Sequence, residues 1–190
     1  IEEEKPDYLG VAFDLPKPTF RHQRFEGYKL HRRPMPDPLV DQLPWIKQVL
    51  AGYRVPIYEM EGYEADDILG TVALKAAKEG LTAYLVTGDK DILQVVGKQV
   101  KVYRPLKDGH EILDNATLFE KWRLRPEQVV EVMALMGDAV DAIPGVPGIG
   151  EKTAVDLIQK FGSVEKLVKH LEKEEKPQVK PSVAQAVKAN

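Results

Sequence analysis

Acidic residues in four short motifs are the part of this sequence best suited to chemistry. One acid follows the apolar run YLGVAF, and two more follow the apolar run AYLVT. Like carboxylates that pack together repel one another and raise each other's pKa unless cations neutralise them. One or two bound divalent ions would solve this problem. The candidate ligands are Asp14, Glu64, Asp66, Asp67, Asp89, Asp91, Asp138 and Asp141.

The available ligand types narrow the choice of metal. The sequence has no cysteine, and its four histidines are scattered over positions 22, 31, 110 and 170. A site built from oxygen ligands selects Mg²⁺ or Mn²⁺ over Zn²⁺. Two such ions would suit in-line displacement at a phosphodiester, because one can activate the attacking hydroxide and the other can stabilise the leaving oxygen.

Helix capping is the simpler interpretation of any single acidic motif. Acids favour the positive end of a helix dipole, and Asp is a good N-cap residue. The segment EADD, at the start of a long apolar-periodic stretch, reads as capping when taken alone. Acids at the ends of two separate strands are not explained by caps, so the combination favours metal ions.

The pattern of apolar residues predicts a parallel α/β sheet covered by helices. Ligands bind at the carboxyl ends of such strands, which would gather three of the four acidic motifs. The pair in GDAVD should share one face of a helical turn. We expect strands over 8–13, 55–59, 82–87 and 100–104, a turn over 107–110, and helices over 45–53, 64–80, 91–96, 116–122 and 126–136.

The chain divides into two predicted regions. Residues 1–134 should form the α/β core, with a basic segment inside 17–44, and residues 135–190 should form a small helical subdomain. The stretch 172–190 is expected to be a loop plus a short helix. Because the chain begins without a methionine or a signal-peptide pattern, we expect it to be cut from something longer.

The composition excludes fewer classes of function than the motifs do. The 190 residues are 43% hydrophobic and 30% charged, which excludes fibrous and wholly disordered chains. No run approaches the length of a membrane helix, and the lack of cysteine is compatible with a reducing cytosol. The net charge of −3 hides a basic segment over 17–33, which contains six basic residues, one acid and three aromatic residues.

Glycines follow the last acidic pair in the segment IPGVPGIGEKTA. Gly145, Gly148 and Gly150 would permit a tight turn and close approach by another backbone. Free amides at the start of the next helix, which carries Lys152 and Lys160, would bind a nucleic-acid phosphate. The motif has neither the preceding strand of a dinucleotide fingerprint nor the GK[ST] of a P-loop. A plain helix–helix connector is the alternative.

Together the segments FDLPKPTFRHQRFEGYKLHRRPMP, GYEADDILGT, VTGDKD and ALMGDAVDAIPGVPGIGEKTA resemble the 5′-nuclease family. This family comprises the 5′→3′ exonuclease and flap endonuclease domain at the N-terminus of bacterial DNA polymerase I and related stand-alone nucleases. The resemblance extends from Tyr8 to Ser182. It implies an α/β PIN-like core, a helical basic arch and a helix-three-turn-helix subdomain.

The resemblance also assigns roles to residues. Asp14, Glu64, Asp66 and Asp67 would lie nearer a first metal, and Asp89, Asp91, Asp138 and Asp141 nearer a second. Arg21 and Lys29 would be catalytic at the scissile phosphate, with Lys29 stabilising its charge; without the motif, Lys29 would be read as a solvated surface lysine. Tyr28 could stack on a base or pack the arch. The residues implied in DNA binding are Arg21, Tyr28, Lys29, Arg32, Gly148, Gly150, Lys152 and Thr153.

The family further implies partners and a place of action. DNA with 5′ flaps, nicks or 5′ ends would be the substrate, hydrolysed with two Mg²⁺ or Mn²⁺ ions during replication and repair. Carbonyls of the glycine hairpin would hold a K⁺ ion. We expect a monomer in the bacterial cytosol or nucleoid, with no membrane association, and a C-terminal polymerase domain is one expected continuation.

Two departures from the family leave alternatives open. The family's first strand, which carries another metal-binding Asp, is expected before Ile1, so this piece itself could be inactive. Val140 and Ala142 replace a small polar residue and an Asn, which removes polar support for the second metal. A DNA-structure binding module without catalysis is therefore an alternative. A PIN-type ribonuclease is a third, although it has no need of the glycine hairpin.

Overall fold

The computed structural model describes residues 4–173 and 179–190. Its contacts divide the chain into two units, residues 1–72 and 73–190, with the division inside one helix, α4 (Ala65–Lys78). Residues 174–178, part of the loop expected near the C-terminus, lie outside the described residues. Within the described ranges, no helix is both long and apolar enough to cross a membrane.

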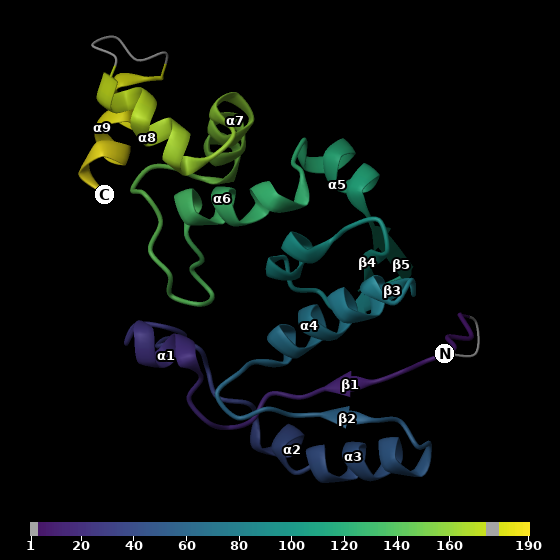
Figure 1. The fold of residues 1–190 in the computed structure, drawn as a ribbon. Coiled ribbons are helices and arrows are strands. Elements are labelled where there is room, and N and C mark those ends of the chain that lie inside the picture. Colours follow the sequence, from purple (N-terminus) through teal and green to yellow (C-terminus); the bar gives the residue numbers. More distant parts are fainter. Residues whose placement is uncertain (1–3, 174–178) are drawn as a thin grey trace. The chain divides into compact units, whose positions relative to one another are not determined.

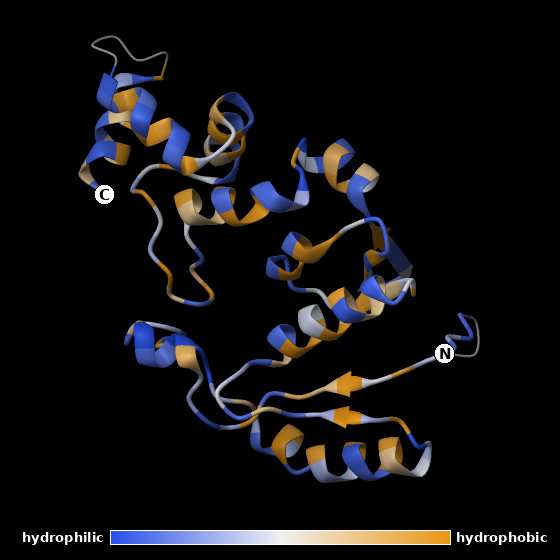
Figure 2. Ribbon diagram, in the orientation of Figure 1, coloured by the Kyte–Doolittle hydropathy of each residue, from blue (hydrophilic) through white to orange (hydrophobic). Residues whose placement is uncertain are grey.

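The first unit is built on two short parallel strands, β1 (Val11–Ala12) and β2 (Ile57–Tyr58). The helix α3 (Leu43–Gly52) lies beside β2 (Figure 1). Both strands are hydrophobic, whereas α3 alternates hydrophobic and hydrophilic residues (Figure 2). This pairing confirms the parallel arrangement predicted for the first two strands and leads the chain from β1 directly to Asp14.

Short helices form in and after the basic segment, despite its prolines. The helix α1 (Phe20–Arg24) begins at Thr19, whose backbone N–H donates to His22 Nδ1 at 3.1 Å. The short helix α2 (Asp37–Val40) lies before α3, where the pattern of apolar residues predicted no element. A proline in the first turn of a helix loses no hydrogen bond, which explains why Pro38 and Pro44 are tolerated there.

The second unit contains a three-stranded sheet in the order β3-β4-β5. The strands β3 (Ala83–Val86) and β4 (Val100–Leu106) are parallel, as predicted. The strand β5 (Gly109–Leu113) pairs antiparallel with β4. It was not predicted, because it is short and half-exposed and its first residues were assigned to the preceding turn. Although the run AYLVT is apolar, Leu85 is the buried residue of β3.

Between these strands, the predicted helix at Asp91 is a 3₁₀ helix, η1 (Asp91–Val95), against which α6 (Pro126–Met136) packs. The helices α7 (Glu151–Phe161), α8 (Val164–Lys173) and α9 (Pro181–Ala189) complete the predicted helical region. They share a hydrophobic core with α6, in which Leu135, Ile158, Leu167 and Leu171 are almost completely buried. This core fixes the ends of α6 and α7, between which the glycine segment runs.

The helix α5 (Asn115–Trp122) offers a test of local stability. Asp114 accepts hydrogen bonds from the backbone N–H groups of Thr117 and Ala116, and these bonds lower the pKa of Asp114. The cap is therefore present above the carboxyl's unfolded pKa and is lost as the pH falls through its folded pKa. Asp114→Ala should cost about 1 kcal/mol of unfolding free energy at neutral pH.

The matched variant for this cap is Asp114→Asn. The amide oxygen can still accept both bonds but does not titrate, so this variant should lose less stability and should show a shallower loss on acidification. Urea unfolding of all three proteins between neutral pH and pH near 3 measures both effects. A full loss of stability in Asp114→Asn at neutral pH would contradict the assignment.

Candidate functional site

The carboxylates of the first unit surround the first turn of α4. Asp14 Oδ1 accepts the Ala65 N–H at 2.7 Å, although the two residues are 51 positions apart. Asp67 Oδ2 accepts the Glu64 N–H at 3.0 Å, which is the helix-capping bond that the segment EADD predicted. The capping interpretation is therefore confirmed for Asp67, and a shared metal site for the four acids stays a prediction. Asp66 lies half-buried on the same turn.

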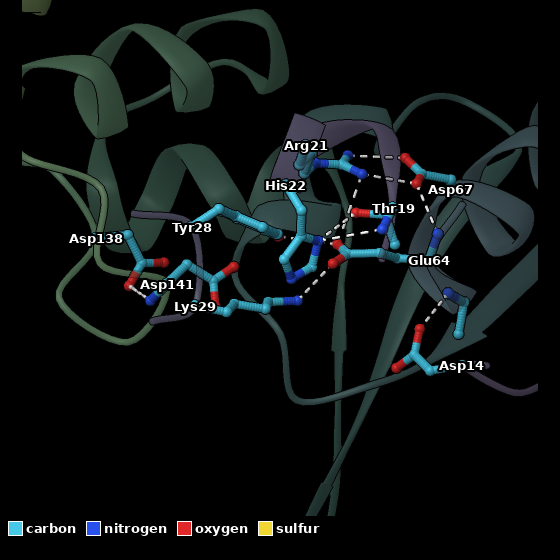
Figure 3. Close-up of polar contacts among 11 residues, drawn as sticks. Asp14, Thr19, Arg21, His22, Tyr28, Lys29, Glu64, Asp67, Asp138 and Asp141 are labelled. Atoms are coloured by element: carbon cyan, nitrogen blue, oxygen red, sulfur yellow. Dashed lines mark hydrogen bonds and ion pairs between the residues drawn. The ribbon is translucent and has the colours of Figure 1, made fainter. Parts of the chain in front are cut away.

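Basic residues of the same unit reach these carboxylates (Figure 3). Arg21 donates two hydrogen bonds to Asp67, at 2.7 and 2.8 Å, and Lys29 Nζ lies 2.7 Å from Glu64 Oε1. The bonds from Arg21 lower the pKa of Asp67, and those to Asp67 raise the pKa of Arg21. Both groups therefore remain charged near neutral pH.

Tyr28 is a buried residue that contacts the same cluster of acids and bases, formed by Glu64, Asp67, Arg21 and Lys29. Its side chain is 5% exposed, its hydroxyl donates to Glu64 Oε2 at 2.9 Å, and its ring meets that of His22 edge-on. The packing interpretation of Tyr28 thus describes this structure. A hollow of 380 Å³ lies beside the cluster, and its lining includes Asp14, His22, Lys29, Arg32 and Glu64.

The second unit brings three carboxylates together. Oxygens of Asp91, Asp138 and Asp141 all lie within 4.8 Å of one another, and each residue is half-buried. The packing of α6 against η1 places Asp91 near the end of α6, where Asp138 follows. Asp89 is exposed, and its Oδ1 accepts the Asp91 N–H at 2.9 Å. It therefore supports the loop that carries Asp91.

The segment after α6 is not the helical turn that the spacing predicted. Asp138 pairs with Ile143 through two backbone hydrogen bonds of 2.9 and 2.8 Å, and its Oδ1 accepts the N–H groups of Val140 and Asp141. This side-chain turn, rather than helical periodicity, sets the approach of the two acids. Turns made by Asp side chains compete with helix formation, which explains the difference.

Two glycines hold this turn in place. A Cβ on Gly145 would lie 2.2 Å from the Met136 carbonyl carbon, and one on Gly137 would lie 2.3 Å from the Gly145 nitrogen. The sequence analysis predicted a close backbone approach at Gly145 but not at Gly137. The position of Gly137 directly before the acidic pair could have suggested it. Gly148 has a φ of +81°, which suits glycine. Gly150 is the N-cap of α7 and meets nothing within 4 Å at its Cβ position.

The remaining predicted DNA-binding residues lie on two surfaces. Arg32 is exposed in the first unit, and Lys152 is exposed on the first turn of α7, where Thr153 is half-buried. Lys90, between the acids of the β3 loop, lies 3.6 Å from Glu151 at the start of α7. Sequence reasoning did not single out this pair, and only the charges of the two residues could have suggested it.

Comparisons with known proteins identify the family. The family described as 5′-3′ exonuclease, N-terminal resolvase-like domain, matches residues 1–123, and its C-terminal SAM fold matches residues 124–190. The chain therefore belongs to the 5′-3′ exonuclease family.

Relatives of known name agree with this assignment. The chain is 42% identical to DNA polymerase I of Bacillus caldotenax over 187 residues, 97% of this chain and 21% of that protein. It is 39% identical to a 5′-3′ exonuclease of Aquifex aeolicus over 173 residues, 91% of this chain and 59% of that protein. The chain thus spans about a fifth of the polymerases and less than two thirds of the exonuclease.

Solved structures share the fold. A T5 5′-exonuclease described with bound divalent zinc ions has a TM-score of 0.80 and 22% identity, covering 99% of this chain and 71% of that chain. The catalytic core of Rad2 in complex with DNA has a TM-score of 0.62 and 16% identity, covering 94% of this chain and 56% of that chain. This likeness confirms the predicted fold class, a mixed α/β core followed by a helical region.

Proposed function

We propose that this chain is a structure-specific 5′→3′ exonuclease and 5′-flap endonuclease that hydrolyses DNA phosphodiesters in replication and repair. The observation that carries the proposal is the cluster of Asp91, Asp138 and Asp141 in a chain of the 5′-3′ exonuclease family. Two named relatives support the substrate class, since one is a 5′-3′ exonuclease and another is DNA polymerase I. A following polymerase domain and action in the bacterial cytosol belong to the same proposal.

The donor atoms fit divalent ions such as Mg²⁺ or Mn²⁺. Three carboxylate oxygens within 4.8 Å of one another could together hold one small cation, and no softer ligand is among them. We assign one ion to Asp89, Asp91, Asp138 and Asp141, and a second to Asp14, Glu64, Asp66 and Asp67. When bound, such ions supply an activated hydroxide and charge neutralisation at the leaving oxygen.

The chain's own cations would bind the phosphate. Arg21 and Lys29 already lie within hydrogen-bond distance of the first unit's carboxylates, so a phosphate held beside those acids would be within reach of both. Lys29 would stabilise charge on the phosphate, and Arg21 would orient it. Arg32, which lines the same hollow, would contact the 5′ strand, with Tyr28 supporting Lys29 from the interior.

The glycine hairpin would hold duplex DNA away from the cut. The N-cap residue of α7, Gly150, has no side chain that could accept the first amides of the helix, so these amides would be available to a phosphate. Lys152 and Thr153 would add to this grip, and hairpin carbonyls near Gly148 would take a K⁺ ion. Such contacts do not depend on base sequence, which suits selection of DNA by its structure.

A duplex with a fluorescent 5′ flap tests the function. With Mg²⁺ the protein should release a product cut near the junction, and EDTA should abolish the product while binding persists. The absence of product with both Mg²⁺ and Mn²⁺, with binding retained, would instead support the DNA-binding module without catalysis. That alternative is favoured by Val140, which is 71% exposed in the acidic turn and offers no polar group. Preference for RNA over the flap would support the ribonuclease.

A further inference from the structure

The carboxylates assigned to the first ion already bind cations of the chain itself. Asp67 accepts both bonds of the Arg21 guanidinium, and Glu64 accepts Lys29 on one oxygen and the Tyr28 hydroxyl on the other. Arg21 also lies 3.5 Å from Glu64 Oε2. Figure 3 shows these groups converging on the two acids. All of these residues belong to one unit of the chain.

These ion pairs are stronger than ordinary surface pairs. Their side chains are only 14–34% exposed, which limits screening by solvent, and the Arg21–Asp67 pair is bidentate. A divalent ion on the same oxygens would stand within a few ångströms of both positive groups and would be repelled by them. Because this repulsion opposes ion binding, the present ion pairs and a bound divalent ion compete for these two carboxylates.

We propose that Arg21 and Lys29 are internal counter-ions, which a divalent ion must displace from Asp67 and Glu64 before it binds. The inference rests on the proposed function, because it takes these two acids to be metal ligands. Displacement would turn the two cationic groups toward a phosphate. Metal binding and phosphate binding would then favour each other, because both require the same ion pairs to be broken.

Metal affinity gives a first test. Calorimetric titration with Mn²⁺ should show about 3- to 10-fold tighter binding for Arg21→Gln than for the wild type, because the competing ion pair is gone. Arg24→Gln is the control, since it removes the same charge from the same helix. Within the part of the chain that the structure describes, Arg24 contacts the Phe20 ring and makes no ion pair. Equal effects of the two variants, or weaker binding in Arg21→Gln, would overturn the proposal.

The Arg21 guanidinium itself gives a second, local test. In ¹⁵N spectra of the metal-free protein, rotation of this group should be slow, because both of its ends are bonded to Asp67. Saturating Mg²⁺ should make the rotation fast. If Mn²⁺ binds the wild type but the Arg21 group remains restricted with Mg²⁺, the exchange is wrong while the proposed function stands. If the wild type binds no divalent ion, both are wrong.

Discussion

Asp138→Asn is expected to abolish flap cleavage while the fold is preserved. The asparagine oxygen can still accept the N–H groups of Val140 and Asp141, so the turn after α6 should keep its shape. The charge that a divalent ion requires is lost. The cleavage rate should fall by more than the roughly 10- to 100-fold cost of losing a group that only supports a ligand. Single-turnover cleavage with Mg²⁺ measures the effect.

The control for this prediction is Asp156→Asn. Asp156 lies on α7, outside the acidic cluster, and is exposed, so this variant should cleave at the wild-type rate. Affinity for flap DNA in EDTA should be unchanged or higher in Asp138→Asn, because one negative charge fewer faces the phosphates. Wild-type cleavage by Asp138→Asn would remove this residue from the site.

Gly145→Ala is expected to destabilise the second unit strongly. Its new Cβ would lie 2.2–2.4 Å from backbone atoms of Met136 and Gly137, which cannot move without breaking the end of α6. We expect a loss of about 3 kcal/mol or more in unfolding free energy, the upper range for an overpacked site. Urea unfolding followed by circular dichroism measures it.

Substitutions of two other glycines should cost less unfolding free energy and serve as controls. Gly148→Ala meets no neighbouring atom but must adopt a φ of +81°, so it should cost about 1 kcal/mol. Gly97→Ala meets nothing within 4 Å and carries no positive φ, so it should be nearly neutral. If Gly145→Ala were no more destabilising than Gly148→Ala, the close backbone crossing would not exist in the protein.

The sequence was sufficient to predict several of the helices and strands that precede or carry the acids. Apolar periodicity identified α4 and α6, and apolar runs identified the strands that precede Asp14 and Asp89. The motif EADD gave the first turn of α4 correctly. The family resemblance then assigned the acids to two metal ions, and the comparisons confirmed the family.

The sequence could not predict which side chains from distant segments bond to one another. No local pattern indicates that Arg21 will bond Asp67, or Lys29 Glu64, since each pair joins segments far apart in the chain. The turn at Asp138 was misjudged because a spacing of three residues fits both a helix and an Asp side-chain turn. The hydrogen bonds of Asp138 and the close approach of Gly137 and Gly145 decide between them.

The most direct measurement is a crystal structure of the protein soaked in Mn²⁺, with anomalous data collected at the manganese edge. We predict an anomalous peak among Asp91, Asp138 and Asp141, at about 2.1 Å from their oxygens, the usual distance for a small divalent ion with oxygen ligands. A protein that cleaves flap DNA with Mn²⁺ but shows no manganese at these three carboxylates would contradict it.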